Sequence, residues 1–214
     1  MGKDGIDWEQ MYRDKFAPWD VKRPDSHLAD IVKNTPVKPC RVLELGCGTG
    51  TNAIWLARQG FTVTAIDLSA TALDQARKKD GADACTFVLA DFFDDPLPGT
   101  DFGFVFDLGC LHGFKNPEHR DILACRVARC LSDDGYWLNL SSSQDGPHIG
   151  PNRLSAREIT AAVEPYFQIL SLRATIFDDM SPEDREALGL PAGFPTPLAF
   201  SCFMRKRGPE DGSD

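Results

Sequence analysis

Residues 41–50, RVLELGCGTG, are an apolar run that leads directly into three glycines at alternate positions. Val42, Leu43 and Leu45 predict a buried strand, and the residues from Thr51 onward predict a helix. Glycine is favoured in such a turn because it adopts positive φ angles and lets the backbone lie directly against a ligand. Free amides at a helix N-terminus commonly bind an anionic or polar group. These residues therefore predict a strand, a ligand-binding loop and a helix.

The alternation of apolar and amphipathic segments continues along the chain. The apolar segments lack a polar face, which is typical of parallel strands covered by helices on both sides. A parallel, doubly wound α/β sheet is therefore predicted. Further strands are expected over residues 61–66, 84–89, 102–106, 136–140, 167–177 and 197–205, and helices over 51–59, 69–79, 117–131 and 155–163, with Ile122, Leu123, Val127 and Leu131 on one face of the helix over 117–131.

Two helices are predicted before the first strand, over residues 7–16 and 26–34. Asp7 and Ser26 are suitable N-caps, because both residue types accept hydrogen bonds from backbone amides. The loop between these helices contains Pro18-Trp19-Asp20, a Trp and Asp pair that packing alone does not explain.

An insertion is predicted late in the chain, over residues 178–196, because this segment is too long for a simple hairpin turn. Ser181-Pro182 predicts the start of a short helix within it, and Gly189 is a natural C-cap. Residues 207–214 are polar and are expected to be disordered.

Acidic residues follow three of the predicted strands, as Asp67, Asp91 and Asp107. In an open α/β sheet, ligands bind beyond the carboxyl ends of the strands. Asp67 lies 21 positions after Gly46, the spacing of a carboxylate that accepts both hydroxyls of a ribose, and Asp91 is suited to an adenine amino group. The spacing G-x-G-x-G, with Glu44 in front, differs from the G-x-G-x-x-G of dinucleotide enzymes. A nicotinamide dehydrogenase is therefore the weaker alternative.

Composition narrows the classes of partner. With 23 Lys and Arg against 32 Asp and Glu, the formal net charge is −9, and such a surface repels a nucleic-acid backbone. No apolar run reaches the ~18 residues of a membrane span, and the N-terminus lacks the apolar core of a signal peptide. The seven cysteines form no C-x-x-C pair and the four histidines show no metal-site spacing. Free thiols in a reducing cytoplasm, and no bound metal, are therefore expected.

These motifs together resemble those of the class I S-adenosylmethionine-dependent methyltransferases. Residues 44–50 read E-x-G-x-G-x-G, and Asp67 and Asp91 match the acidic positions of that family. The resemblance covers residues 40–141.

A narrower resemblance, to the thiopurine, thiol and tellurite-resistance methyltransferase group, extends over most of the chain. It is carried by Trp8, Tyr12, Pro18-Trp19-Asp20, residues 106–112 (FDLGCLH), Arg120 and residues 131–135. Thiopurine-type members usually have Arg where this sequence has Leu108, which argues against a thiopurine substrate. No Asn- or Asp-Pro-Pro-Tyr motif follows the fourth strand, which argues against amino-methylation of adenine or glutamine.

The resemblance implies a Rossmann-like α/β fold, with a mostly parallel seven-stranded sheet and an antiparallel last strand. It implies a single domain over residues 1–206, in which residues 1–39 form a cap and residues 178–196 a lid. The implied cofactor is S-adenosylmethionine, and the chain is expected to act as a monomer on a small molecule. The expected cofactor-binding residues are Trp8, Trp19, Glu44, Gly46, Cys47, Gly48, Gly50, Thr51, Asn52, Asp67, Leu68, Asp91, Phe92 and Asp107.

The implied reaction is an in-line transfer of a methyl group from a sulfonium to a nucleophile, in which positioning and desolvation provide most of the catalysis. A thiol or related chalcogen is the expected acceptor, because a thiol with a free pKa near ~8.5 needs little help to ionise. Methyl transfer to oxygen or nitrogen, and cofactor binding without catalysis, are the alternatives. The candidate proton acceptors are His112, Asp20 and Asp107, and the expected acceptor-binding residues are Trp19, His112, Phe177 and Phe194.

Overall fold

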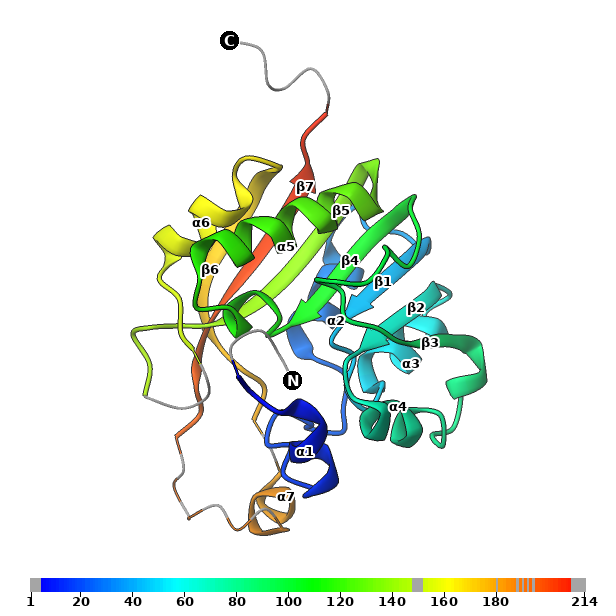
Figure 1. Ribbon diagram of the computed structural model, residues 1–214, viewed down its shortest axis with the longest axis vertical. Coiled ribbons are helices and arrows are strands. Elements are labelled where there is room, and N and C mark those ends of the chain that lie inside the picture. The colour runs from blue at the N-terminus through cyan, green and yellow to red at the C-terminus, as the bar shows by residue number, and fades with distance from the viewer. Residues whose placement is uncertain are drawn as a thin grey trace.

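One mixed sheet forms the centre of the molecule. The computed structural model describes residues 5–147, 152–179, 181–187, 189, 191, 193 and 195–208, and the account below is limited to them. The strands are β1 Arg41–Leu45, β2 Thr62–Asp67, β3 Cys85–Leu89, β4 Phe102–Leu108, β5 Leu131–Ser142, β6 Phe167–Ile176 and β7 Leu198–Lys206. They form a seven-stranded sheet in the order β3–β2–β1–β4–β5–β7–β6 (Figure 1). Only β7 runs antiparallel to its neighbours, β5 and β6. The predicted α/β fold with an antiparallel last strand is confirmed.

Helices cover both faces of this sheet. They are α1 Trp8–Arg13, α2 Ser26–Asn34, α3 Thr51–Arg58, α4 Ala70–Ala76, α5 Pro117–Cys130, α6 Ala156–Val163 and α7 Pro182–Ala187, with short 3-10 turns η1 Ala82–Ala84 and η2 Leu111–Gly113. Figure 1 shows α5 and α6 in front of the sheet, with α2 and α3 behind it. Each face is closed by its own apolar cluster, with Leu123, Val127, Ile159 and Val163 in the first and Leu28, Leu56 and Leu73 in the second.

The strand order reverses between β1 and β4. The loop after β1 and the turn after β4 therefore meet at the switch point of the sheet, where ligands of open α/β folds bind. Figure 1 shows α1 and α7 at the end of the sheet toward which the parallel strands point. The fold thus brings the glycine loop, the N-terminal cap and the late insertion to the same end of the molecule.

The N-cap of α2 is Asp25 rather than the predicted Ser26. The Asp25 carboxylate accepts hydrogen bonds from the amides of His27, at 2.9 Å, and Leu28, at 3.0 Å. Ser26 is instead the first helical residue, and its own amide and hydroxyl bond to a carboxylate far away in the sequence. Both residue types are good caps, so the sequence alone did not choose between them.

Some predicted helix details also need correction. α1 ends three residues earlier than predicted, because Lys15 adopts a φ of 57°, which a right-handed helix does not contain. Ile122, expected on the buried face of α5, is 40% exposed, because that face is centred on Leu123 and Val127. Leu131, expected in the helix, begins β5.

The segment between β6 and β7 contains the predicted short helix, α7. Gly189 follows it with a φ of 67°, and its amide donates to the carbonyl of Glu186 at 2.9 Å, as a C-cap glycine does. Phe194 and residues 209–214 of the predicted disordered tail lie outside the described residues. Within the part of the chain that is described, no helix is both long and apolar enough to cross a bilayer.

Candidate functional site

The loop after β1 is shaped by glycines at positions where a side chain would be strained. Gly46, Gly48 and Gly50 have φ angles of 61°, 53° and 74°, in the left-handed region that glycine favours. A Cβ atom on Gly48 would lie 2.5 Å from Tyr12 Oη, and one on Gly46 would lie 2.8 Å from Cys110 Sγ. The loop is therefore enclosed between α1 and the turn after β4.

The carboxylate of Asp67, at the end of β2, lies directly against this loop. Its Oδ2 accepts from the Gly48 amide at 2.7 Å, and its Oδ1 accepts from the Ser69 amide at 2.8 Å. Burial raises the pKa of Asp67, and these backbone hydrogen bonds oppose the rise. A carboxylate has about four acceptor sites, so Asp67 keeps capacity for a ligand hydroxyl. Leu68, the next residue, is 39% exposed and offers an apolar surface beside it.

Glu44 is a buried carboxyl group in β1 with an unsatisfied oxygen. Burial raises its pKa to about 8, and a hydrogen bond with Asn52 opposes the rise. Glu44 Oε2 is buried without a hydrogen-bond partner among the described residues. Asn52 Oδ1 accepts from the Asp25 amide at 2.9 Å, which ties the start of α2 to the start of α3. A buried oxygen without a donor is suited to a hydrogen bond from a bound molecule.

Aromatic side chains of the N-terminal cap close over the glycine loop. Trp19 Nε1 donates to Tyr12 Oη at 2.9 Å. Trp8 meets Trp19 edge to face, with ring centroids 5.3 Å apart. The two predicted Trp residues therefore form one aromatic group with Tyr12, which touches the loop at Gly48.

Glu9 anchors α1 to α4, a role that was not predicted from the sequence. Its carboxylate accepts from Ser69 Oγ at 2.6 Å and from Thr71 Oγ1 at 2.7 Å. These hydrogen bonds lower the pKa of Glu9 to about 2. A lone Glu in a short amphipathic helix carries no sequence signal for a partner 60 residues away.

Asp20, a candidate proton acceptor, is engaged with the glycine loop. Its Oδ2 accepts from Thr49 Oγ1 at 2.9 Å. Lys79 Nζ donates to Thr49 Oγ1 at 2.6 Å and to Thr51 Oγ1 at 2.8 Å, and burial lowers the pKa of this lysine. These contacts join the cap, the loop and the segment after α4. They favour a positioning role for Asp20 over proton transfer.

Asp107 lies inside the sheet, and its carboxylate is occupied by several donors. It is fully buried and accepts from Trp137 Nε1 at 2.7 Å, Asn139 Nδ2 at 2.9 Å and the Cys110 amide at 2.9 Å. Burial raises its pKa to about 6, and these hydrogen bonds oppose the rise. The geometry favours an orienting role, in which Asp107 fixes the turn that carries Cys110 and His112.

His112 stands in η2, directly after that turn. Its Nδ1 accepts a hydrogen bond from the Ser142 amide at 3.2 Å, which links it to the end of β5. Burial lowers the pKa of His112 to about 4. The ring of Phe177, a predicted acceptor-binding residue, lies with its centroid 6.2 Å from the imidazole. The structure therefore brings these two predicted residues together beside the switch point.

Other predicted cofactor residues take structural positions. Phe92 is 9% exposed and packs in the cluster beneath α5, with the Arg126 guanidinium 5.4 Å from its ring centroid. Cys47 is buried in the opposite cluster. Asp91 Oδ1 accepts from the Phe93 amide at 2.8 Å and shapes the turn after β3. The structure favours packing for the side chains of Phe92 and Cys47 over contact with a cofactor.

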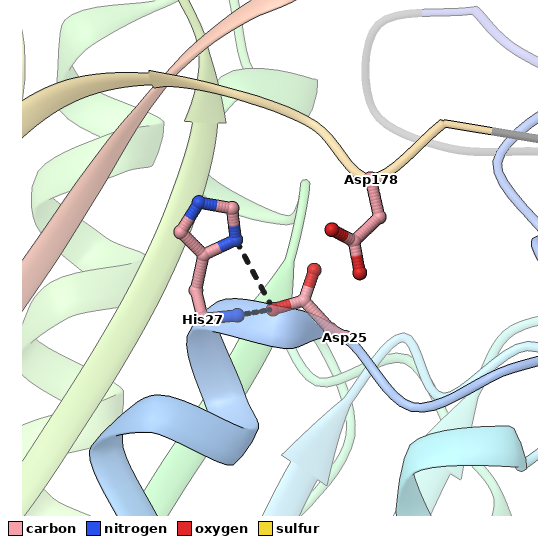
Figure 2. Close-up of side chains that lie close together, drawn as sticks. All are labelled: Asp25, His27 and Asp178. Carbon is pink, nitrogen blue, oxygen red and sulfur yellow. Dashed lines mark hydrogen bonds and ion pairs between the residues drawn. The ribbon is translucent and has the colours of Figure 1, made fainter. Parts of the chain in front are cut away.

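Asp25, His27 and Asp178 form the one group among the described residues with the composition of a metal site. Figure 2 shows them between the start of α2 and the chain after β6, with donor atoms within 4.8 Å of one another. Asp178 already accepts from Ser26 Oγ at 2.6 Å, from the Ser26 amide at 2.7 Å and from Arg23 Nη1 at 2.9 Å. The Arg23 guanidinium would repel a cation. We therefore assign a structural role to this group, called the α2 clasp, which holds the chain after β6 and consists of Arg23, Asp25, Ser26, His27 and Asp178.

These features define a class of protein. An open α/β sheet with a glycine loop at its switch point, and a carboxylate at the end of the neighbouring strand, is built to bind a nucleotide-containing cofactor.

Comparison with known proteins identifies the family. The profile of a family described as "Methyltransferase domain" matches residues 42–135. "Probable thiol methyltransferase 2" of Arabidopsis thaliana is 29% identical over 67% of this chain and 65% of its own length, just under two thirds. "Thiocyanate methyltransferase 1" of Brassica oleracea is 26% identical over 85% of this chain and 82% of its own. An uncharacterized methyltransferase of Schizosaccharomyces pombe is 32% identical over 47% of this chain and 71% of its own.

A solved structure described as "Conversion of a Disulfide Bond into a Thioacetal Group during Echinomycin Biosynthesis" has the same fold. The superposition covers 95% of this chain and 92% of the solved chain, with a TM-score of 0.78 and 22% sequence identity. The chain belongs to the class I S-adenosylmethionine-dependent methyltransferases. The cofactor of this family is S-adenosylmethionine, and the residues present fit it: the three glycine positions of the loop leave no room for a Cβ, Asp67 has spare acceptor capacity and Glu44 offers an unpaired oxygen.

Proposed function

We propose that this protein transfers the methyl group of S-adenosylmethionine to a small sulfur nucleophile, a thiol or a related chalcogen. The observation that carries this proposal is that Asp107 is fully buried and its carboxylate already accepts from Trp137, Asn139 and the Cys110 amide, while Asp20 is held by Thr49. A buried carboxylate with several donors is poorly placed to deprotonate an alcohol, and the bond to Thr49 favours a positioning role for Asp20, whereas a thiol ionises near ~8.5 without help. The relatives named as thiol and thiocyanate methyltransferases support the same acceptor class.

Different residues of the site would bind different parts of the cofactor. The backbone of the glycine loop, the Asp67 carboxylate and Leu68 would hold the nucleoside part of the cofactor, and Glu44 would accept a hydrogen bond from its amino group. When bound, the cofactor supplies an electrophilic methyl group on a positively charged sulfur. Tyr12 and Trp19 cover the loop and exclude water, which strengthens the attraction between an anionic nucleophile and that charge.

The test of this proposal combines binding with turnover. S-adenosylmethionine at a hundredfold excess over its Kd is expected to raise the Tm by about 5–10 °C, and NAD to leave it unchanged. Labelled methyl groups are expected to appear on thiols, and not on matched alcohols or amines of the same carbon skeleton. Stabilisation by NAD alone would reverse the cofactor assignment. Cofactor binding without transfer to any acceptor would reduce the protein to a binding protein.

The organisation of the chain adds further proposals. All seven cysteines are free thiols, which supports a reducing compartment such as the cytoplasm. We also propose a monomer with one domain over residues 1–206, in which residues 1–39 are the cap and residues 178–196 the lid. A sedimentation experiment that found a dimer would contradict the monomer.

A further inference from the structure

We infer that His112 positions the acceptor by donating a hydrogen bond from Nε2–H to its negatively charged atom, and that the acceptor loses its proton before it binds. This inference rests on the proposed function and assigns His112 the role of a specificity-determining donor rather than a general base.

The hydrogen bond from Ser142 fixes the tautomer of His112. A backbone amide can only donate, so Nδ1, which lies 3.2 Å from the Ser142 nitrogen, must present its lone pair. A neutral imidazole carries one proton, and with Nδ1 accepting that proton is on Nε2. Because burial lowers the pKa of His112 to about 4, this neutral form is the one present at neutral pH. The free nitrogen of the ring is therefore a donor and has no lone pair with which to accept a proton.

The surroundings hold the ring in this orientation. A Cβ atom on Gly109 would lie 3.0 Å from His112 Cε1, so the turn after β4 packs closely against the imidazole. The ring of Phe177, directly after β6, lies tilted to the imidazole with the two centroids 6.2 Å apart. The side chain is half-buried, and none of the described residues accepts a hydrogen bond from Nε2. Nε2–H is therefore available to a ligand at the carboxyl ends of the strands.

The reaction balances without a base. An electron pair of the anionic acceptor sulfur forms the new S–CH3 bond, while the bond between the methyl carbon and the sulfonium breaks and its electron pair stays on that sulfur. One anion and one cation become two neutral thioethers, and no proton moves. A neutral donor such as Nε2–H can stabilise the anion in the bound state without protonating it, because a neutral imidazole gives up its N–H proton far less readily than a thiol does.

The experiment uses the pH dependence of kcat/KM with acceptors of different acidity. For thiols with pKa values of about 6 and about 9, we expect kcat/KM to rise with pH and to level off above the pKa of the thiol used. For thiocyanate, which is ionised throughout, we expect only the inflections of enzyme groups such as Asp107, near about 6, and Glu44, near about 8, which all acceptors share. A shared inflection that His112→Gln abolishes would overturn the inference.

Variants test the donor itself. His112→Phe is expected to lower kcat/KM about 10- to 100-fold, the loss that follows removal of a hydrogen bond to a charged group. His112→Gln, whose amide can donate from a similar position, is expected to recover to within about threefold of wild type with an unchanged pH profile. The matched control is His119→Phe, since the His119 ring packs against Phe93 and Phe114 and no ring contact or hydrogen bond among the described residues joins it to His112, and it is expected to stay within about twofold of wild type.

The outcomes separate this inference from the proposed function. If Gln is as defective as Phe for acidic and weakly acidic thiols alike, or if only weakly acidic thiols suffer, His112 is not the donor described here. If wild type methylates alcohols or amines and no sulfur acceptor, the proposed function fails first. Cofactor-induced Tm shifts in both His112 variants report that the rest of the site is intact.

Discussion

At the scale of single residues, Gly48 is where the loop and the cap constrain each other most closely. Its φ of 53° and the 2.5 Å separation between an added Cβ and Tyr12 Oη act against any side chain. We expect Gly48→Ala to lower the free energy of unfolding by about 1–3 kcal/mol and cofactor affinity at least about tenfold. Urea unfolding and calorimetric titration measure the two effects. Gly113→Ala, where a Cβ meets open space, is the control, and equal effects in both variants would contradict the explanation.

The titration of Glu44 gives a pH-dependent prediction. Its pKa rises from 4.5 in the unfolded chain to about 8 in the folded protein, so the folded state keeps a proton that the unfolded state releases. The stabilising contribution of this group is present below about pH 4.5, falls by up to about 1.4 kcal/mol per pH unit above it, and is lost through about pH 8. Glu44→Gln does not titrate.

We therefore expect the variant to gain stability relative to wild type as the pH rises from about 5 to about 8. Urea unfolding without cofactor, at a series of pH values, measures the difference. The exposed Glu183→Gln is the control, for which the two curves should run parallel. Parallel curves for Glu44→Gln as well would show that Glu44 titrates near its ordinary value.

The sequence predicts which residues of the candidate site lie together better than it predicts their hydrogen-bond partners. The three glycines and Asp67 follow from local spacing, and the loop and the strand end lie together as expected. The state of Asp107 depends on Trp137, 30 residues further along the chain, and the tautomer of His112 depends on Ser142, also 30 residues away. Periodicity and motif spacing carry no information on such partners.

At the scale of elements, the α2 clasp links the N-terminal cap to the insertion, two parts of the chain between which the sequence predicted no contact. We expect Asp178→Ala to lower the free energy of unfolding by about 1–2 kcal/mol, since it removes hydrogen bonds from Ser26 and a partly shielded ion pair with Arg23. Amide exchange is expected to accelerate at the start of α2 and in α7 together.

Hydrogen exchange followed by mass spectrometry resolves these elements. Glu183→Gln, on the exposed side of α7, is the matched control and should leave the exchange at α2 unchanged. Acceleration confined to α7 would mean that the clasp does not couple the two elements.

Element positions were largely predictable because the apolar runs and caps are local signals. Ser155 shows this well, since it forms a capping box with Glu158 at the start of α6. The choice of Asp25 over Ser26 as the cap of α2 was not predictable, because the two residues are adjacent and both are good caps, and the partner of Ser26, Asp178, is 152 residues away. A local rule cannot choose between two adjacent residues that both satisfy it.

At the scale of the whole molecule, charge affects how fast the cofactor arrives. The protein carries a formal charge of −9, and S-adenosylmethionine carries about +1 at neutral pH, so their long-range attraction is screened by salt. We expect its association rate constant to fall about two- to tenfold between about 20 and about 200 mM salt. Stopped-flow fluorescence of Trp8 and Trp19 measures this rate. Adenosine, which is uncharged, should show no such dependence, and an equal dependence for both would rule out steering.

The position of β7 has a consequence for how the protein is made. β7 stands between β5 and β6 and is the sole strand neighbour of β6 among the described strands. Residues 198–206 leave the ribosome after β6 does. Until then both edges of β6 are unpaired, and unpaired strand edges are prone to aggregation. Asp178 lies just beyond β6, and Phe177, which packs near His112, hydrogen-bonds to Pro197. The acceptor side of the site is therefore completed last during synthesis, and a chain stalled before residue 198 is a natural client for chaperones.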